Sequence, residues 1–270
     1  MRLKRKNKKN IPIQAAQETE EASVDGALPR QALLEHLKAL RNVIIVSVAA
    51  LAAGFLVMFL GFSDQLLAFI KSPINARGID LIYLSLYETL ATQMKVSFIA
   101  GAVVASPVVF WCVWSFVKPA LYPREGRIVL SLFFVTVFLF LLGAVFAYLI
   151  VFQMAVNFFL VTSAGIATPF ISIEKYTDFL VGFVLPFGLT FELPVVMVIV
   201  TRSGILPVSF FTKCRKFIIF AIFLIAAILT PPDVVSQVLL ALPLVLLFEI
   251  GILASKIMRK RYEKQRGMEN

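Results

Sequence analysis

Glu192 occupies the position in this chain that raises the sharpest chemical question. It lies in the stretch FGLTFELPVV (residues 187–196), between Pro186 and Pro194, inside an otherwise apolar run. A carboxyl group is costly to place in hydrocarbon, and prolines remove helix hydrogen bonds, so we expect a kinked helix here. Two interpretations follow: a glutamate hydrogen-bonded between helices of this chain, or a polar contact for a partner helix or a coupling ion. The cost of burial favours the second.

Two further acidic residues interrupt apolar sequence. Glu249 precedes Lys256 by seven residues, so its carboxyl group can pair or extend to the membrane interface, and we group it with Glu192 as an intramembrane polar or partner contact. Asp233 lies in TPPDVVSQ, where Thr230 can cap a helix and the aspartate takes the place of a capping-box acid. The motif indicates a helix start between two apolar runs and leaves open a contact with a molecule outside the membrane.

The residue types present exclude several chemistries. The chain has one histidine, His36, and two cysteines, Cys112 and Cys214, far apart in the sequence. A single histidine excludes a His-rich metal cluster, and two distant cysteines do not indicate a disulfide framework. The sequence also contains no nucleophile motif and no phosphate-binding loop motif. We therefore expect neither an enzyme nor a cofactor. The basic start, MRLKRKNKKN, is interpreted as a topology determinant or a contact with anionic membrane lipid, and not as a nucleic-acid site.

Most of the chain must lie in a membrane. Of its 270 residues, 60% are hydrophobic and 16% are charged, and a soluble domain cannot cover that much apolar side chain. Several apolar runs reach the roughly 20 residues that cross a bilayer as a helix. The sequence predicts an all-α polytopic membrane protein with six transmembrane helices, near 42–62, 96–117, 129–152, 179–200, 217–230 and 235–254. The third run continues to about residue 161, and the fifth is short at about 14 residues.

Lysine and arginine residues orient these spans, because they are retained on the cytoplasmic side. All of the 26 Lys and Arg residues lie on one side of the predicted spans, except Lys71, Arg77, Lys95 and Lys175. Both termini are therefore expected in the cytoplasm.

The charge and hydropathy patterns divide the chain into three parts. Residues 1–30 are expected to be a disordered charged N-terminal tail, 31–256 the six-span membrane domain, and 257–270 a basic cytoplasmic C-terminal tail. Within the membrane domain, the segment 63–95 lies on the outer side and carries apolar patches. We expect it to form a packed cap of short helices.

Five stretches, in this order, resemble the twin-arginine translocase subunit TatC. They are HLKALR (36–41), SPVVFWCVWSFVKPALYPRE (106–125), FGLTFELPVV (187–196), TPPDVVSQ (230–237) and LPLVLLFEIGI (242–252). The resemblance covers roughly residues 31–256 and implies six helices in a concave, glove-like arrangement without catalytic chemistry. It implies a receptor for signal peptides that carry two adjacent arginines, which moves folded proteins with the proton-motive force. The implied partners are TatA, TatB and other copies of itself, in a bacterial inner membrane in preference to a thylakoid membrane.

The resemblance also assigns roles to single residues. Glu125, in the loop KPALYPREGR, matches a cytoplasmic glutamate that helps to recognise the arginine pair; its basic neighbours alone indicate only a solvated ion pair. Phe116 and Pro119 match positions of the family pattern that precede Glu125. Glu192 matches an intramembrane glutamate linked to contacts with partner helices, and Asp233 matches the acid of the outer motif.

Two positions depart from the family pattern. Ala39 stands where the family has a glutamate, and Cys112 where it has a glutamine. We hypothesise that Glu35, one helical turn before Ala39, replaces the missing carboxylate and binds signal-peptide arginines together with Glu125. The alternative is that Glu35 only pairs with Lys38 on its own helix.

A different functional class also uses carboxyl groups inside a membrane. A proton-coupled secondary transporter could employ Glu192 and Glu249 for ion coupling. Such transporters are built from two matched halves with broken helices in corresponding positions, and the sequence contains no such repeat.

Overall fold

The computed structural model describes residues 13–121, 126–163, 169–229 and 234–266, with side chains described over 37–117, 130–163, 169–228 and 234–259. The chain divides into two compact units, Met1–Val46 and Ser47–Asn270. In the first unit, the described residues form the N-terminal part of helix α1 (Ile13–Asn75). The second unit contains the rest of α1 and all other elements.

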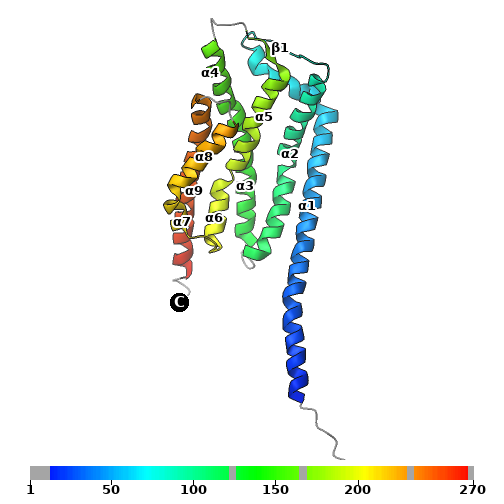
Figure 1. Ribbon diagram of the computed structural model, residues 1–270, viewed down its shortest axis with the longest axis vertical. Helices are drawn as coiled ribbons and strands as arrows, with labels where there is room; N and C mark the ends of the chain where they lie inside the picture. Colours follow the sequence, from blue (N-terminus) through cyan, green and yellow to red (C-terminus); the bar gives the residue numbers. More distant parts are fainter. Residues whose placement is uncertain (1–12, 122–125, 164–168, 230–233, 267–270) are drawn as a thin grey trace, which may run out of the picture. The chain divides into compact units, whose positions relative to one another are not determined.

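Helices dominate the described part of the second unit (Figure 1). They are α2 (Glu88–Leu121), α3 (Gly126–Phe146), the π-helical turn η1 (Ala147–Phe152), α4 (Gln153–Ser163), α5 (Ile173–Thr190), α6 (Leu193–Arg202), α7 (Val208–Lys213), α8 (Arg215–Leu229) and α9 (Val234–Arg266). Two short strands, β1 (Leu81–Ile82) and β2 (Ile171–Ser172), pair in parallel.

Within the described residues, five helical segments are long and apolar enough to cross a membrane. They are Leu37–Asn75, Glu88–Val117, Leu130–Ser163, Ile173–Arg202 and Val234–Arg259. The third confirms the predicted extension of its apolar run, because α3, η1 and α4 follow one another without a break to Ser163. Helix α8 has 15 residues, about 22 Å at 1.5 Å per residue, which is shorter than a bilayer core. The prediction of an all-α polytopic membrane protein is confirmed.

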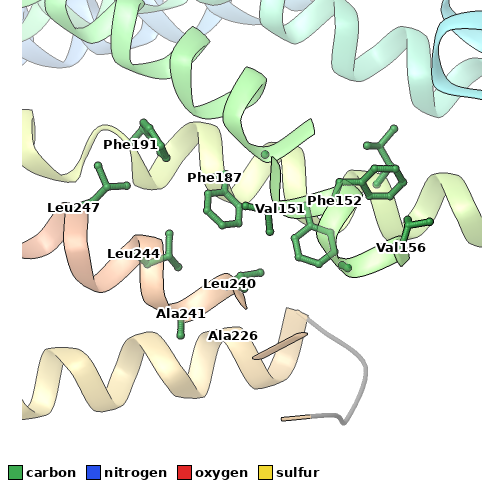
Figure 2. Close-up of a cluster of buried hydrophobic side chains, with 14 of the residues drawn as sticks. Val151, Phe152, Val156, Phe187, Phe191, Ala226, Leu240, Ala241, Leu244 and Leu247 are labelled. Atoms are coloured by element: carbon green, nitrogen blue, oxygen red, sulfur yellow. The ribbon is translucent and has the colours of Figure 1, made fainter. Parts of the chain in front are cut away.

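The helices of the second unit pack around one large apolar cluster. Helix α3 packs on α2 and α5, while α6 and α8 both pack on α9. Figure 2 shows Phe187 of α5 above Leu240 and Leu244 of α9; the side chains of Phe187, Phe152 and Leu240 have no exposed surface. Lipid tails are as apolar as these side chains, so close van der Waals packing stabilises the contact more than exclusion of water does.

Residues 63–95 do not form the expected cap of short helices. Helix α1 continues to Asn75, β1 follows, and α2 begins at Glu88. The apolar patch near the end of α1 is the physical reason, since Leu67, Ile70 and Ile74 are buried in the large cluster as part of one continuous helix face.

A buried carboxylate, Glu88, joins the starts of α2 and α5. Its side chain is 4% exposed. It accepts hydrogen bonds from the Leu84 backbone N–H at 3.0 Å, the Ser85 hydroxyl at 3.3 Å and the Ser172 hydroxyl at 3.2 Å. Ser172 is also the N-cap of α5, where its oxygen accepts from the Glu174 N–H. We call Glu88, Ser85 and Ser172 the Glu88 latch, which fixes two helix starts beside each other.

Candidate functional site

Glu192 lies where the fourth long segment is interrupted. Helix α5 ends at Thr190, α6 begins at Leu193, and Glu192 is the N-cap residue of α6. Pro194, in the first turn of α6, has no N–H to offer the Thr190 carbonyl. The carbonyl of Pro186, inside α5, accepts a hydrogen bond from the Thr190 hydroxyl at 2.6 Å. The structure shows the interruption that the two prolines predict.

The carboxyl group at this interruption is buried and incompletely hydrogen-bonded. Glu192 is 9% exposed, and its Oε1 atom has no hydrogen-bond partner among the residues that the structure describes. The polar groups that face the carboxyl group are the Thr136 side chain and the Phe140 backbone, both on α3. Leaving a buried polar atom without a partner costs about 1–3 kcal/mol. The site therefore has unused capacity to bind a hydrogen-bond donor.

A tryptophan on α2 extends this polar contact. The Trp114 indole Nε1 donates to Thr136 Oγ1 at 3.3 Å in a buried position. The same indole packs with Val195 of α6, next to partly buried Phe110 and Phe133. Three helices thus contribute to the surroundings of Glu192: α2 gives the donor to Thr136, α3 gives Thr136, and α6 carries the carboxyl group.

Two glycines allow α3 and α5 to approach closely beside the site. A Cβ atom on Gly143 of α3 would lie 2.7 Å from Cγ of Phe191, the residue that precedes Glu192. A Cβ atom on Gly188 of α5 would lie 2.9 Å from a ring carbon of Phe140. Each phenylalanine thus occupies the space left by a glycine on the facing helix, and this fixes Glu192 against α3.

Glu249 makes a specific contact that differs from the one suggested by its sequence neighbours. Its Oε2 atom lies 3.0 Å from Nη2 of Arg215, the first residue of α8, and both side chains are about two-fifths exposed, at 39% and 44%. The partner is Arg215, and the structure records no ion pair with Lys256 among the described residues. This ion pair joins the start of α8 to α9.

The other predicted site residues are only partly placed. Phe116 lies half-buried on α2. Pro119 lies on α2 and Glu35 on α1, but their side chains are outside the described set, while Glu125 and Asp233 are outside the described residues altogether. The structure therefore describes the surroundings of Glu192, whereas the signal-peptide site remains a prediction from the sequence. No group of three or more potential metal ligands occurs among the described residues.

Sequence inspection missed Thr136, Trp114 and Arg215. Thr136 is a single hydroxyl in the run SLFFVTVFLF, a weak signal that could have been noted as a polar residue at the depth of Glu192. In the sequence Arg215 is only one of the cations that orient the spans, because its pairing with Glu249 depends on how α8 folds back along α9.

Comparisons with known proteins agree with this architecture. A family model described as "Sec-independent protein translocase protein (TatC)" matches residues 35–243. The chain is 40% identical over 230 residues to Carboxydothermus hydrogenoformans TatC, covering 85% of this chain and 94% of the relative. It is 38% identical over 241 residues to Magnetococcus marinus TatC, covering 88% and 89%. A crystal structure described as twin arginine translocase receptor TatC superposes with a TM-score of 0.77 at 36% identity, covering 83% of this chain and 99% of that one.

The region matched by the family model contains the helix interruption at Glu192 and the whole of four of the five stretches that suggested the family; of the fifth it contains only Leu242 and Pro243. The chain therefore belongs to the TatC family of Sec-independent protein translocase subunits.

Proposed function

We propose that this chain is the core receptor of a twin-arginine translocase, which binds twin-arginine signal peptides and moves folded proteins across the membrane with the proton-motive force. Family membership and the similarity to a solved receptor support the proposal. As a TatC-family subunit the chain is a multi-pass, non-enzymatic transport component. The cell membrane of a bacterium is the expected location, since the relatives named above are bacterial.

The proposed topology has six membrane helices in a concave, glove-like arrangement, with both termini in the cytoplasm. The five long segments supply five crossings, and α8 supplies the short remaining one beside α9. Because α8 has only 15 residues, either the bilayer around it must become thinner or neighbouring helices must shield α8 from lipid. The one-sided distribution of lysine and arginine supports the orientation.

The buried Glu192 carboxyl group is the single observation that carries the proposed mechanism. Inside the membrane no water satisfies a polar side chain on a single-span partner of the TatA or TatB kind, so such a partner gains by pairing with the unsatisfied Oε1 atom of Glu192. Because this atom is buried, the side chains around it must move apart before the partner can reach it. For Glu249 to contact a partner helix as well, its ion pair with Arg215 must first open. Other copies of this chain are further proposed partners.

Signal-peptide recognition is proposed at the cytoplasmic face. Two adjacent guanidinium groups are best held by carboxylates in bidentate geometry. Glu35, which precedes α2 in the sequence, and Glu125, which follows it, are proposed to supply these carboxylates. Phe116 and Pro119 are proposed to shape the same site, and Asp233 to act on the opposite side of the membrane. Arginine is required here because lysine lacks the planar fork of donors.

Complementation of a translocase-deficient strain tests the proposal. The strain receives this chain with TatA and TatB subunits and a folded fluorescent reporter that carries a twin-arginine signal. We expect export of the reporter, and loss of export when the two signal arginines are changed to lysines. Equal export of both reporters would contradict receptor function, as would export that persists after the proton-motive force is dissipated.

A further inference from the structure

A cavity of about 810 Å³ lies between α7, the start of α8 and the end of α9. Its wall combines cationic, hydroxyl and apolar side chains: Arg215, Lys256, Arg259, Thr212, Leu253 and Ile257. The volume is within the range of small-molecule sites, about 300–1,000 Å³. None of the residues that line it belongs to the surroundings of Glu192.

The charge of this cavity favours an anion. Three cationic side chains line it, and none of its described lining residues is acidic. On the rim of this region, the Glu249 carboxylate lies 3.0 Å from Arg215. Like charges that share a cavity repel each other, and a phosphate group, with several acceptor oxygens, relieves that repulsion through charge-assisted hydrogen bonds.

The apolar side of the cavity continues along α9. Leu253 and Ile257 line the cavity and are 59% and 46% exposed, and Ile250 and Leu246 follow on the same helix at 46% and 63%. Spacings of three or four residues place all four on one helix face. A ligand that fits both parts has an anionic head at the cations and a hydrocarbon chain along this face.

We propose that the cavity binds the phosphate group of an anionic glycerophospholipid, with one acyl chain lying along Leu246, Ile250, Leu253 and Ile257. The cations lie at the end of α9 that the proposed topology places in the cytoplasm, so the lipid belongs to the inner leaflet and the inference rests on that topology. Basic pockets between membrane helices on this side suit anionic headgroups. The lipid would hold α7, α8 and α9 together where α8 is too short to be anchored by the bilayer alone.

Lipid binding by the purified protein tests the proposal. The protein in dodecyl maltoside is titrated with phosphatidylglycerol, or with phosphatidylcholine that carries the same acyl chains, and bound lipid is measured by native mass spectrometry. We expect selective retention of phosphatidylglycerol. The double variant Lys256→Gln/Arg259→Gln should lower the apparent affinity about tenfold or more, because it removes two charged contacts to phosphate.

A matched control separates a built site from general surface charge. Lys213 and Lys216 are exposed cations of the same region that do not line the cavity. The double variant Lys213→Gln/Lys216→Gln removes the same charge and should leave the affinity for phosphatidylglycerol unchanged. Equal weakening by the two double variants would overturn the proposal, as would equal retention of phosphatidylcholine by the parent protein.

A further arm distinguishes the lipid from free phosphate. Glycerol 3-phosphate carries the same anionic group without acyl chains, and it should not displace the bound lipid. Full displacement would show a site for soluble phosphate compounds and overturn the lipid assignment. These measurements need no export activity, so a failed complementation experiment and a failed lipid titration are separate results. Circular dichroism and gel filtration of each variant confirm that the fold is retained.

Discussion

The indole nitrogen of Trp114 donates to the hydroxyl of Thr136, and Thr136 faces the carboxyl group of Glu192. This contact crosses from α2 through α3 to α6, three elements that are separated along the chain by loops. Polar side chains therefore contact one another inside the membrane, although a TatC-family subunit is not an enzyme and needs no catalytic groups there. The purpose of such polarity is therefore contact and positioning.

Replacing the Thr136 hydroxyl tests this contact. Thr136→Val keeps the shape of the side chain and should lower the free energy of unfolding by about 0.5–1.5 kcal/mol, because Trp114 loses its acceptor. Thr162→Val is the control, since that exposed hydroxyl donates only to the Phe158 carbonyl of its own helix. Thermal unfolding in detergent measures both. Equal melting temperatures for Thr136→Val and the parent would show that the contact is energetically neutral.

The polarity of Glu192 should matter more than its charge. Glu192→Gln should retain much of the export activity and partner recruitment, because an amide still hydrogen-bonds a partner helix, while Glu192→Leu should lose most of both. Co-purification of TatA-like and TatB-like subunits, together with reporter export, measures the effect. Normal recruitment by Glu192→Leu would mean that the carboxyl group is only tolerated at this position.

The close approach of α3 to the α5 end predicts a steric effect. Gly143→Ala places a methyl group against Cγ and Cβ of Phe191 and the Phe187 carbonyl, and should cost about 1–3 kcal/mol of stability. Gly61→Ala, also inside a helix, meets nothing within 4 Å and should be neutral or stabilising by up to about 1 kcal/mol. Thermal unfolding compares the two. A Gly143→Ala protein as stable as Gly61→Ala would show that the two helices separate easily.

Cysteine labelling checks the proposed topology. The labelled cysteines are Asp80→Cys and Lys213→Cys, each introduced into a chain from which Cys112 and Cys214 have been removed. The nearby loop positions Gly78 and Gly204 are avoided, because their φ angles of 74° and 78° strain any residue other than glycine. An impermeant maleimide should label position 80 from the outer side and position 213 only after the membrane is opened. Labelling of both from one side would contradict the six-helix arrangement.

The hypothesis that Glu35 supplies the carboxylate that the resemblance leads us to expect at Ala39 can be tested directly. Glu35→Ala should weaken crosslinking of a twin-arginine signal peptide to this chain, and the added change Ala39→Glu should restore it, because the two positions are one helical turn apart. Photo-crosslinking measures both. If Glu35→Ala crosslinks like the parent while Glu125→Ala does not, Glu125 acts without Glu35.

The sequence predicts those features that depend on local patterns. The long helix that ends at Ser163 follows from an unbroken apolar run, and the interruption at Glu192 follows from Pro186 and Pro194. The contact between Trp114 and Thr136 was not predictable, because it depends on the rotation of α2 and α3 about their axes. The pairing of Leu81 with Ile171 was equally hidden, since strands of two residues have no detectable alternation.

The Glu88 latch has a consequence for how the protein is made. One of its hydrogen bonds joins residues that are 84 positions apart, yet Ser172 is the last residue that it requires. The three hydrogen bonds described above involve no residue of helices α6 to α9. The latch can therefore close while the C-terminal third is still being synthesised, so that α2 and α5 are joined before the α8–α9 hairpin enters the bilayer. The α8–α9 pair would then insert beside helices that are already joined, and α9, which packs on the short α8, would shield it from lipid.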